Sequence, residues 1–446
     1  MRTGHPDPDL PNPPSAPGST ALGSLLFLMG LLTGLVLMAL VELMVPDEEE
    51  QDVAFYRRVR DLVSSSFVRE LDDREILDHA LRGMVEGLDP YSRYYTAEDL
   101  PRIDRETEGR YRGIGVVFDS PVSAGRVLFP MSNSPADRAG LTVGDRMLEI
   151  NGLEVAGMPE GGLQEALREP PDGELDLLVE GLDGARRRVS LSPEPVVDPT
   201  VRHTRILDRD RGIGYLAIRS FSRQTPAEFD AEIAALEQQE LRALVLDLRG
   251  NPGGVLDAAV QVANRFIASG VIVTTASRAG TLPTEADEDV CALRDLPLAV
   301  LVDADTASAS EVLAGALQDH RVGVLVGDRT YGKGAVQSLV RFDQEGVRVK
   351  LTTSYYATPA HRIIERELAD RSTPGLSPDL LVPVSPLERR RIYEHLDSYS
   401  PPAESWQAIE EWEEREDRTL IARAPEDAQL EVALEVFRGS RPPGAD

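Results

Sequence analysis

Short apolar runs alternate with a helical pattern over residues 296–337. Residues 296–302 form an apolar run typical of a buried strand, and a helical pattern covers residues 312–320. A second apolar run, residues 322–326, leads into a glycine-rich stretch. This order predicts a strand, a helix and a second strand, with Ser308 at or near the start of the helix. Unpaired backbone N–H groups gather at a helix start, so a developing oxyanion would be stabilised beside Ser308.

The same alternation precedes this stretch and predicts an α/β core over residues 196–390. Four elements are expected in the order strand, helix, buried strand and helix, at residues 212–218, 226–238, 244–248 and 255–267. The turn between the last two reads Arg249-Gly-Asn-Pro-Gly253-Gly254. Its glycine pair either lets backbone N–H groups point into a cleft or only satisfies the geometry of a tight turn.

The N-terminal part of the chain falls into three stretches. Residues 1–20 are rich in proline and predict a disordered tail. The next 21 residues, Ala21 to Val41, carry no charge and as a helix would extend about 31 Å, enough to span a bilayer. Because acidic residues follow without a small-residue cleavage site, we expect an uncleaved transmembrane signal anchor over residues 21–45. Residues 52–89 show helical periodicity and predict a helical segment over residues 46–105 that either packs on the core or serves self-association.

Residues 106–195 have the pattern of a small β-rich unit. The tripeptide Gly113-Ile114-Gly115 leads into a β-branched strand, and a Ser-Pro helix start, a glycine turn and an apolar strand follow over residues 134–155. Such a turn presents successive backbone N–H groups to a carboxylate, while a strand edge binds a peptide as an added strand. The unit resembles a PDZ domain with two helices, in which the tripeptide would bind the C-terminal carboxylate of a peptide. Its second helix is expected at residues 161–168.

Composition narrows the classes of function. The formal net charge of −29 over 446 residues argues against nucleic acid or anionic lipid surfaces as partners. A single cysteine, Cys291, excludes an intrachain disulfide. No His-rich or Cys-rich cluster offers a metal site, so we expect neither a metal nor another cofactor. Residues 391–446 are acidic and amphipathic and predict a helical C-terminal tail that packs on the core or serves self-association.

Lysine is almost absent from the chain. Of its 47 lysine and arginine residues, only Lys333 and Lys350 are lysines. Arginine does not lose its proton in a protein, whereas a desolvated lysine does. Lys333 stands between two glycines, which suggests that its deprotonation matters. The alternative is that Lys333 is a residual surface cation in a chain with a general preference for arginine.

The residues around Ser308 and Lys333 carry a resemblance to a known family. The segment Thr-Ala-Ser308-Ala-Ser-Glu-Val is followed, 25 positions after Ser308, by Lys333 in Tyr-Gly-Lys-Gly-Ala-Val-Gln. Both are similar to the carboxyl-terminal processing peptidases, or tail-specific proteases, over roughly residues 50–440. The resemblance implies a serine nucleophile (Ser308), a lysine general base (Lys333) and Gln337 as the third catalytic residue. The family commonly has Gly-Ser where this chain has Asp305-Thr306, which affects the turn before the serine.

The same resemblance implies the rest of the site and its setting. The oxyanion hole would consist of the N–H of Ala309 with the loop of Gly253 and Gly254. The PDZ domain would bind protein substrates with apolar C-termini and gate the activity, and Arg168 would be either a switch or a solvated cation at a helix end. The protein would be a single-pass protein of the bacterial inner membrane with its catalytic part on the periplasmic side. Self-association or an adaptor protein are further possible partnerships.

Purely structural roles compete with catalysis at this helix. Ser308 and Glu311 fit a capping box, in which the serine only caps the helix. His320 is an alternative base, but at the far end of the same helix it would lie about 18 Å from Ser308, beyond hydrogen-bond reach. The same distance makes Asp319 structural. A PDZ scaffold tethered to the membrane, with an inactive peptidase core, is the second class of function.

A nucleotide hydrolase is a more remote alternative. The segment from Gly327 to Lys333 matches most of a P-loop, but Gly334 stands where a Ser or Thr would bind Mg²⁺. The pattern over residues 336–356 predicts a β-hairpin rather than the helix that a P-loop requires. On such a strand Lys333 and Gln337 would share one face, so that the amide would hold the amine. The sequence therefore favours a membrane-anchored serine endopeptidase with a Ser/Lys pair that cleaves proteins near their C-termini.

Overall fold

A computed structural model describes most of the chain. The described residues are 27–36, 48–120, 122–159, 161–167, 173–366, 374–421 and 423–438. They belong to two compact units, Met1–Gly83 and Met84–Asp446. The predicted tail 1–20 and the predicted switch Arg168 lie outside the described residues.

The described part of the first unit is helical. Residues 27–36 form a helix, α2 covers Glu48–Ser66, and α3 covers Asp73–Glu86 and ends within the second unit. Asp72 accepts the Glu75 N–H at 2.7 Å and so caps the start of α3. Among the described helices, none combines the length and the apolar character needed to cross a bilayer. The remainder of the predicted anchor, residues 21–26 and 37–45, is outside the described ranges.

The first domain of the second unit is the predicted β-rich unit. Its elements are α4 Leu100–Glu108, β2 Arg110–Gly113, β3 Val116–Phe118, β4 Val127–Pro130, α5 Pro135–Arg138, β5 Arg146–Ile150, β6 Leu153–Glu154, α6 Gly162–Ala166, β7 Leu175–Glu180, β8 Arg186–Leu191 and β9 Glu194–Val197. The strands form a sheet of order β6-β5-β7-β8 and the pairs β3-β4 and β2-β9. Leu175, Leu177 and Val179 alternate along β7 and are fully buried, so that one face of the sheet forms the core.

A six-stranded sheet forms the centre of the second domain. Its strands, in spatial order, are β10 Val201–Asp208, β11 Ile213–Ile218, β12 Ala243–Asp247, β15 Leu298–Val302, β16 Val324–Gly327 and β19 Leu380–Leu381. β10 is antiparallel to β11, and each later pair is parallel. Every residue of β11, β12 and β15 is buried. Strands covered on both faces need apolar side chains at every position, which explains the unbroken apolar runs in the sequence.

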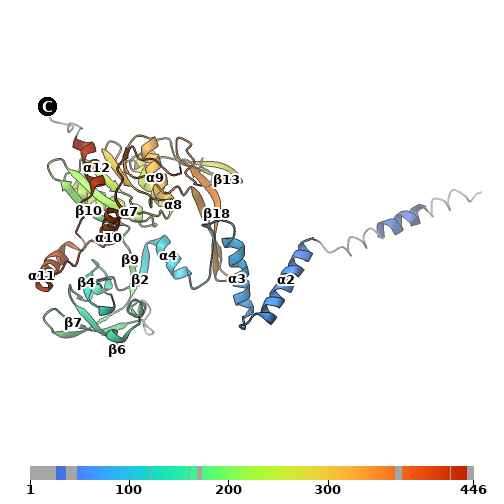
Figure 1. The fold of residues 1–446 in the computed structure, drawn as a ribbon, viewed down its shortest axis with the longest axis horizontal. Coiled ribbons are helices and arrows are strands. Elements are labelled where there is room, and N and C mark those ends of the chain that lie inside the picture. The colour runs from blue at the N-terminus through green and yellow to red at the C-terminus, as the bar shows by residue number, and fades with distance from the viewer. Residues whose placement is uncertain are drawn as a thin grey trace, which may run out of the picture. The chain divides into compact units, whose positions relative to one another are not determined.

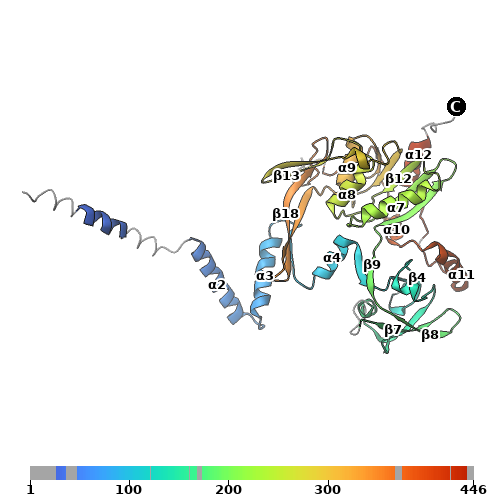
Figure 2. The ribbon, with the colours of Figure 1, turned by 180° about the vertical axis from the view of Figure 1, so that it is seen from behind.

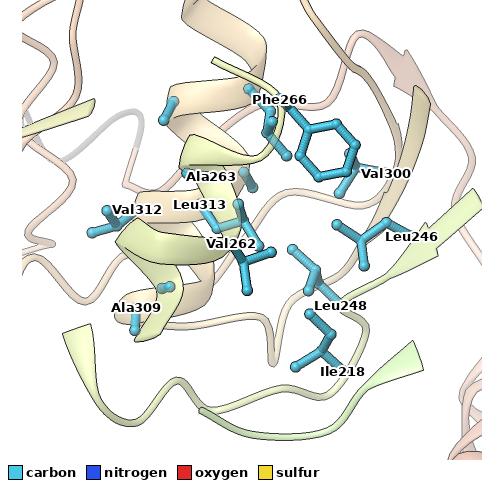
Figure 3. Close-up of a cluster of buried hydrophobic side chains, with 14 of the residues drawn as sticks. Ile218, Leu246, Leu248, Val262, Ala263, Phe266, Val300, Ala309, Val312 and Leu313 are labelled. Carbon is cyan, nitrogen blue, oxygen red and sulfur yellow. The ribbon is translucent and has the colours of Figure 1, made fainter. Parts of the chain in front are cut away.

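Helices cover both faces of this sheet (Figure 1). One face packs against α7 Thr225–Glu237, α8 Leu256–Asn264 and α9 Ala309–Asp319. The other face packs against α10 Pro386–Asp397 and α12 Ala428–Arg438. Figure 3 shows how Leu246 and Val300 of the sheet lie opposite Phe266, which follows α8. The predicted α/β core is therefore confirmed, as a three-layer arrangement.

A second sheet lies next to this core (Figure 2). Its five strands are β1 Arg93–Tyr95, β13 Val271–Ser277, β14 Gly280–Glu285, β17 Ala335–Phe342 and β18 Val347–Ala357. β18 is the central strand and pairs with β17, β1 and β13. The hairpin of β17 and β18 confirms the prediction for residues 336–356, and it occupies the place where a P-loop would need a helix.

The C-terminal segment contacts both domains. Its helix α11, Trp406–Glu416, buries Ile409 and Trp412 against Phe129 of β4 and its neighbours. Arg418, just after α11, forms an ion pair with Asp119 of the β-rich domain. Because α10 and α12 pack on the six-stranded sheet, the helical tail joins the two domains. The predicted helical tail is confirmed, and packing accounts for its buried apolar residues.

Candidate active site

Ser308 lies directly before α9, as the sequence predicts. Its backbone has φ 59° and ψ −120°, in the region of positive φ that non-glycine residues rarely adopt. Such a conformation costs roughly 1–3 kcal/mol and persists only where the surrounding structure holds it. Ser308 is 8% exposed. The chain therefore turns sharply between β15 and α9, with the serine at the turn.

The two residues that depart from the family pattern have partners in this turn. Thr306 Oγ1 donates to Leu248 O at 2.9 Å and accepts the Asp303 N–H at 2.9 Å. Asp305 Oδ2 lies 2.8 Å from the phenol oxygen of Tyr393, which is also 2.5 Å from Asp303 Oδ2. Tyr393 belongs to α10, so a residue of the opposite helical layer supports the turn. Asp305 and Thr306 therefore close the turn with their own hydrogen bonds.

The carboxylate of Glu311 is the centre of a buried network. Glu311 is 0% exposed and accepts four hydrogen bonds, from the N–H groups of Ser308 at 2.9 Å, Gly332 at 2.8 Å and Lys333 at 2.8 Å and from Thr330 Oγ1 at 2.5 Å. Burial raises the pKa of Glu311, and the four donors oppose that rise. The sequence predicts only the capping bond to Ser308. The bonds to Gly332 and Lys333 show that one carboxylate joins the helix start to the lysine segment.

Lys333 occupies a half-buried position before β17. Burial lowers the pKa of its amine, and the positive charge of Lys350 lowers it further, while Glu365 and Glu311 oppose the change. Its Nζ atom lies 4.8 Å from the centroid of the Tyr91 ring. Lys333 is therefore enclosed rather than a residual surface cation.

The structure does not bring Gln337 to the amine of Lys333. Gln337 Nε2 donates to Ala335 O at 3.0 Å and to Thr352 Oγ1 at 3.4 Å. The expectation that both side chains share a strand face is wrong, because β17 begins only at Ala335 and its register shifts between Val336 and Gln337. Such an irregularity interrupts the alternation of side chains. Gln337 instead holds the hairpin together beside Lys333.

The three amides predicted for the oxyanion hole differ in their surroundings. Gly253 lies against the nucleophile turn, since a Cβ atom on it would be 2.7 Å from Ser308 Cβ and 2.9 Å from Ala309 N. With φ 97° and this close approach, only glycine fits there. The Gly253 N–H donates to Asn251 Oδ1 at 2.9 Å. Within the described ranges, the N–H groups of Ala309 and Gly254 have no protein acceptor, which leaves these two available to an oxyanion.

The hydroxyl of Ser308 has a partner that the sequence does not predict. Ser308 Oγ lies 2.7 Å from the phenol oxygen of Tyr356 on β18, and within the described part of the chain no hydrogen bond joins it to Lys333. No local pattern marks Tyr356, because its strand alternates like any other hairpin strand. Only the packing of the second sheet against α9 brings it to the serine.

Asp319 and His320 take structural positions at the far end of α9. The Asp319 carboxylate accepts the Ala360 N–H at 2.8 Å and forms an ion pair with Arg362. His320 Nε2 lies 2.8 Å from Val271 O. Because α9 is one continuous helix of 11 residues, neither side chain reaches Ser308, as the sequence predicts.

The β-rich domain has a groove beside the Gly113-Ile114-Gly115 turn. The groove has a volume of about 500 Å³ and runs along residues 113–118 opposite Gln164 and Leu167 of the α6 region. Gly115 has φ 73° and its carbonyl accepts Ser134 Oγ at 3.1 Å, where a Cβ would meet the serine side chain at 2.3 Å. The predicted tripeptide therefore forms one wall of an open groove next to a strand edge and a helix.

Comparisons with known proteins identify relatives of both domains. The model of peptidase family S41 matches residues 212–382, and a PDZ domain model matches residues 128–181. A carboxy-terminal-processing protease of Bartonella bacilliformis is 29% identical over 93% of this chain and 95% of its own length. A carboxyl-terminal-processing protease of Picosynechococcus is 33% identical over 73% of this chain and 78% of its own. The photosystem II D1 C-terminal processing protease, a solved structure, is 30% identical with a TM-score of 0.42, and covers 74% of this chain and 86% of its own. An identity of 33% that extends over more than two thirds of both chains shows common ancestry, and the chain therefore belongs to the carboxyl-terminal processing serine proteases of peptidase family S41, with a PDZ domain before its α/β peptidase core.

Proposed function

We propose that this protein is a membrane-anchored endopeptidase that cleaves protein substrates near their C-termini with Ser308 as nucleophile and Lys333 as general base. The observation that carries the proposal is the shared carboxylate of Glu311, which accepts the backbone N–H groups of both Ser308 and Lys333. The two candidate catalytic residues, 25 positions apart in the sequence, are thereby held by one buried anchor.

The chemistry that this arrangement supports is acyl transfer. Neutral Lys333 removes the hydroxyl proton of Ser308 while Oγ bonds to the scissile carbonyl carbon, and the carbonyl electrons move onto its oxygen. The tetrahedral intermediate collapses as the C–N bond breaks, and the Lys333 ammonium gives its proton to the leaving amine. Water then hydrolyses the acyl-enzyme by the same steps. The burial that lowers the pKa of Lys333 supports this role, because it makes the neutral amine available nearer to neutral pH.

The N–H groups of Ala309 and Gly254 are the donors best suited to the oxyanion. They have no protein acceptor within the described residues, whereas that of Gly253 is already used by Asn251. In the proposal Gly253 contributes by its lack of a side chain, which lets the loop approach Ser308. Preorganised donors of this kind are worth several kcal/mol to an acyl-transfer transition state.

The PDZ groove and the N-terminal segment complete the proposal. A peptide C-terminus would add to the strand edge at Val116–Phe118, with its carboxylate at Gly113-Ile114-Gly115 and its apolar side chain in the groove. Residues 21–45 would anchor the protein in the bacterial inner membrane, with the catalytic part on the periplasmic side. The uncharged stretch of 21 residues supports the anchor.

The test of the catalytic pair uses the full chain in detergent with an unfolded protein that ends in an apolar residue. Products are followed by mass spectrometry. Ser308→Ala and Lys333→Arg should both abolish cleavage, since arginine keeps the charge but cannot act as the base. Ser338→Ala is the matched control and should retain cleavage, because its exposed hydroxyl is bonded to Thr353 Oγ1 of the hairpin. Cleavage that survives both catalytic substitutions would refute the proposed pair.

A second experiment separates substrate binding from chemistry. The substrate is compared with the same protein amidated at its C-terminus, in parent and Ser308→Ala protein. Loss of binding on amidation would support carboxylate recognition by the groove. Binding without cleavage by the parent protein would favour the PDZ scaffold instead. Membrane anchoring is tested by deleting residues 21–45, which should move the protein from the membrane fraction to the soluble fraction of the cell.

A further inference from the structure

Within the described residues the hydroxyl of Ser308 has one side-chain hydrogen-bond partner, the phenol of Tyr356. The two oxygens are 2.7 Å apart. Tyr356 is 3% exposed and lies near the end of β18, 48 positions after the serine. Its backbone N–H donates to Gly334 O at 2.8 Å, so the strand that carries the phenol is fixed to the residue after Lys333. The phenol is thus positioned against the nucleophile by the same segment that carries the proposed base.

Burial determines the protonation state of this phenol. Burial raises the pKa of Tyr356 well above its ordinary value; the carboxylates of Glu311 and Glu365 raise it further, and the bond to Ser308 opposes them. The phenol therefore keeps its proton at neutral and moderately alkaline pH. The phenol is therefore available as a hydrogen-bond donor over the pH range in which Lys333 is neutral and can act as a base.

Only one proton lies between the two hydroxyl oxygens. If the amine of Lys333 takes the Ser308 proton, that proton points toward Nζ and not toward Tyr356. The bond of 2.7 Å then has Tyr356 as its donor and Ser308 Oγ as its acceptor. One lone pair of Oγ is held by the phenol, and attack on the carbonyl carbon of the substrate uses the other.

We propose that Tyr356 is a third catalytic residue, whose phenol donates a hydrogen bond to Ser308 Oγ, directs the serine proton to Lys333 and stabilises the negative charge that develops on Oγ. The inference rests on the proposed Ser308–Lys333 pair. During attack the O–H bond of Ser308 breaks, its proton goes to Lys333 Nζ and the Oγ–C bond forms. During deacylation a water oxygen bonds to the acyl carbon as Lys333 Nζ takes a proton from that water; the C–Oγ bond then breaks and the Lys333 ammonium gives this proton to Oγ. Tyr356 keeps its own proton in both steps.

A donor to Oγ accelerates both half-reactions for the same reason. Negative charge gathers on Oγ as its proton leaves, and gathers there again when Oγ becomes the leaving group. A hydrogen bond to a charged oxygen is roughly twice as strong as one to a neutral oxygen, so the phenol stabilises the transition states more than the resting enzyme. The effect therefore belongs to the chemical steps and not to substrate binding.

The experiment compares Tyr356→Phe with Tyr355→Phe in the full chain in detergent. Tyr355 is the matched control, because neighbouring residues of a strand point to opposite sides, and its ring is only half-buried. The fraction of enzyme with a competent serine is first measured by titration with a fluorophosphonate. Cleavage of the unfolded substrate then gives kcat and KM, and the rate of fluorophosphonate labelling gives the reactivity of Ser308 without a bound peptide.

For Tyr356→Phe we expect a titratable fraction like that of the parent, a kcat reduced roughly 10- to 100-fold, a KM within about twofold, and slower labelling by a similar factor. The position of the ascending limb of the pH profile should not change, because replacing a neutral phenol by a phenyl ring leaves the charges around Lys333 unchanged. Tyr355→Phe should match the parent throughout.

Two results would overturn the inference. One is a Tyr356→Phe enzyme with parental kcat and labelling rate. The other is a loss of activity explained fully by a smaller titratable fraction, which would make Tyr356 a structural residue. The Ser308→Ala enzyme distinguishes this failure from failure of the proposed function. Cleavage by Ser308→Ala would show that Ser308 is not the nucleophile.

Discussion

The backbones of Ser308 and Lys333 are joined through one carboxylate oxygen. Oε2 of Glu311 accepts the Ser308 N–H at 2.9 Å and the Lys333 N–H at 2.8 Å. The helix start and the lysine segment are therefore bonded to the same side chain. This link also explains how Ser308 is held at positive φ, since its N–H donates to the side chain of Glu311 in the helix that follows it.

The first prediction concerns Glu311→Gln. The amide of glutamine would place an NH₂ group against donors that now share a carboxylate, leaving at least one buried donor without an acceptor at a cost of about 1–3 kcal/mol. Unfolding in urea should show a free energy of unfolding lower by at least that amount, and cleavage should fall with it. Glu388→Gln is the control, because Glu388 occupies the same capping-box position in the first turn of α10 but is exposed, and should have little effect. Equal small losses in both variants would contradict the buried network.

The second prediction concerns the pH dependence of cleavage. Lys333 acts as a base only when neutral, so activity should rise with pH, and its midpoint should lie below the ordinary lysine value of 10.5. The positive charge of Lys350 lowers the pKa of Lys333, and removing it must therefore raise that pKa. Lys350→Met should shift the ascending limb to higher pH in a profile of kcat/KM. Lys350→Arg retains the charge and should leave the limb in place; a shift in the opposite direction with Lys350→Met would refute the assignment.

The third prediction concerns the buried ion network that connects the oxyanion loop to the C-terminal tail. Arg249 is 2% exposed and forms ion pairs with Asp247 at 2.6 Å and Asp427 at 2.7 Å. Asp427→Asn should reduce the free energy of unfolding by about 1.5–3 kcal/mol, because a buried guanidinium loses a charged acceptor. Asp397→Asn breaks the more exposed pair with Arg219 and should cost less than about 1 kcal/mol. Urea denaturation of both variants provides the comparison, and a reversed order would show that the buried pair contributes little.

The fourth prediction concerns the two tryptophans of α11. Trp412 is 1% exposed and packs against Phe129 of the PDZ domain, whereas Trp406 on the same helix is 43% exposed. Trp412→Ala should lower the free energy of unfolding by about 3–5 kcal/mol through lost burial and the cavity left behind. It should also expose the junction between the PDZ domain and the tail to limited proteolysis. Trp406→Ala should change both readouts much less, and similar losses in the two variants would show that α11 does not hold the domains together.

Much of the fold follows from local pattern. The fully apolar run 296–302 predicts a strand covered on both faces, and β15 is buried at each position, because a parallel strand between helical layers has no solvent side. The start of α9 at Ser308, the glycine turn at Gly253-Gly254 and the hairpin after Lys333 are likewise set by residues that neighbour one another in the chain.

The site was predictable only in part. The residue types and the spacing of Ser308 and Lys333 single out both residues, and the structure anchors them on one carboxylate. The partner of Gln337 was not predictable, because the register shift in β17 depends on how that strand pairs with β18. The contact of Tyr356 with Ser308 had no signal either, since it joins two elements of different sheets and layers.

Local patterns in the chain specify the order of elements, the two candidate catalytic residues and the glycine turns, since each depends on side-chain periodicity or backbone freedom over a few neighbouring residues. The packing of the layers selects which polar groups meet, such as Glu311 with Lys333, Arg249 with Asp427 and Ser308 with Tyr356. Those contacts depend on the distances between packed layers. Buried polar groups must find partners, but nothing local in the chain states which partner the packing will supply.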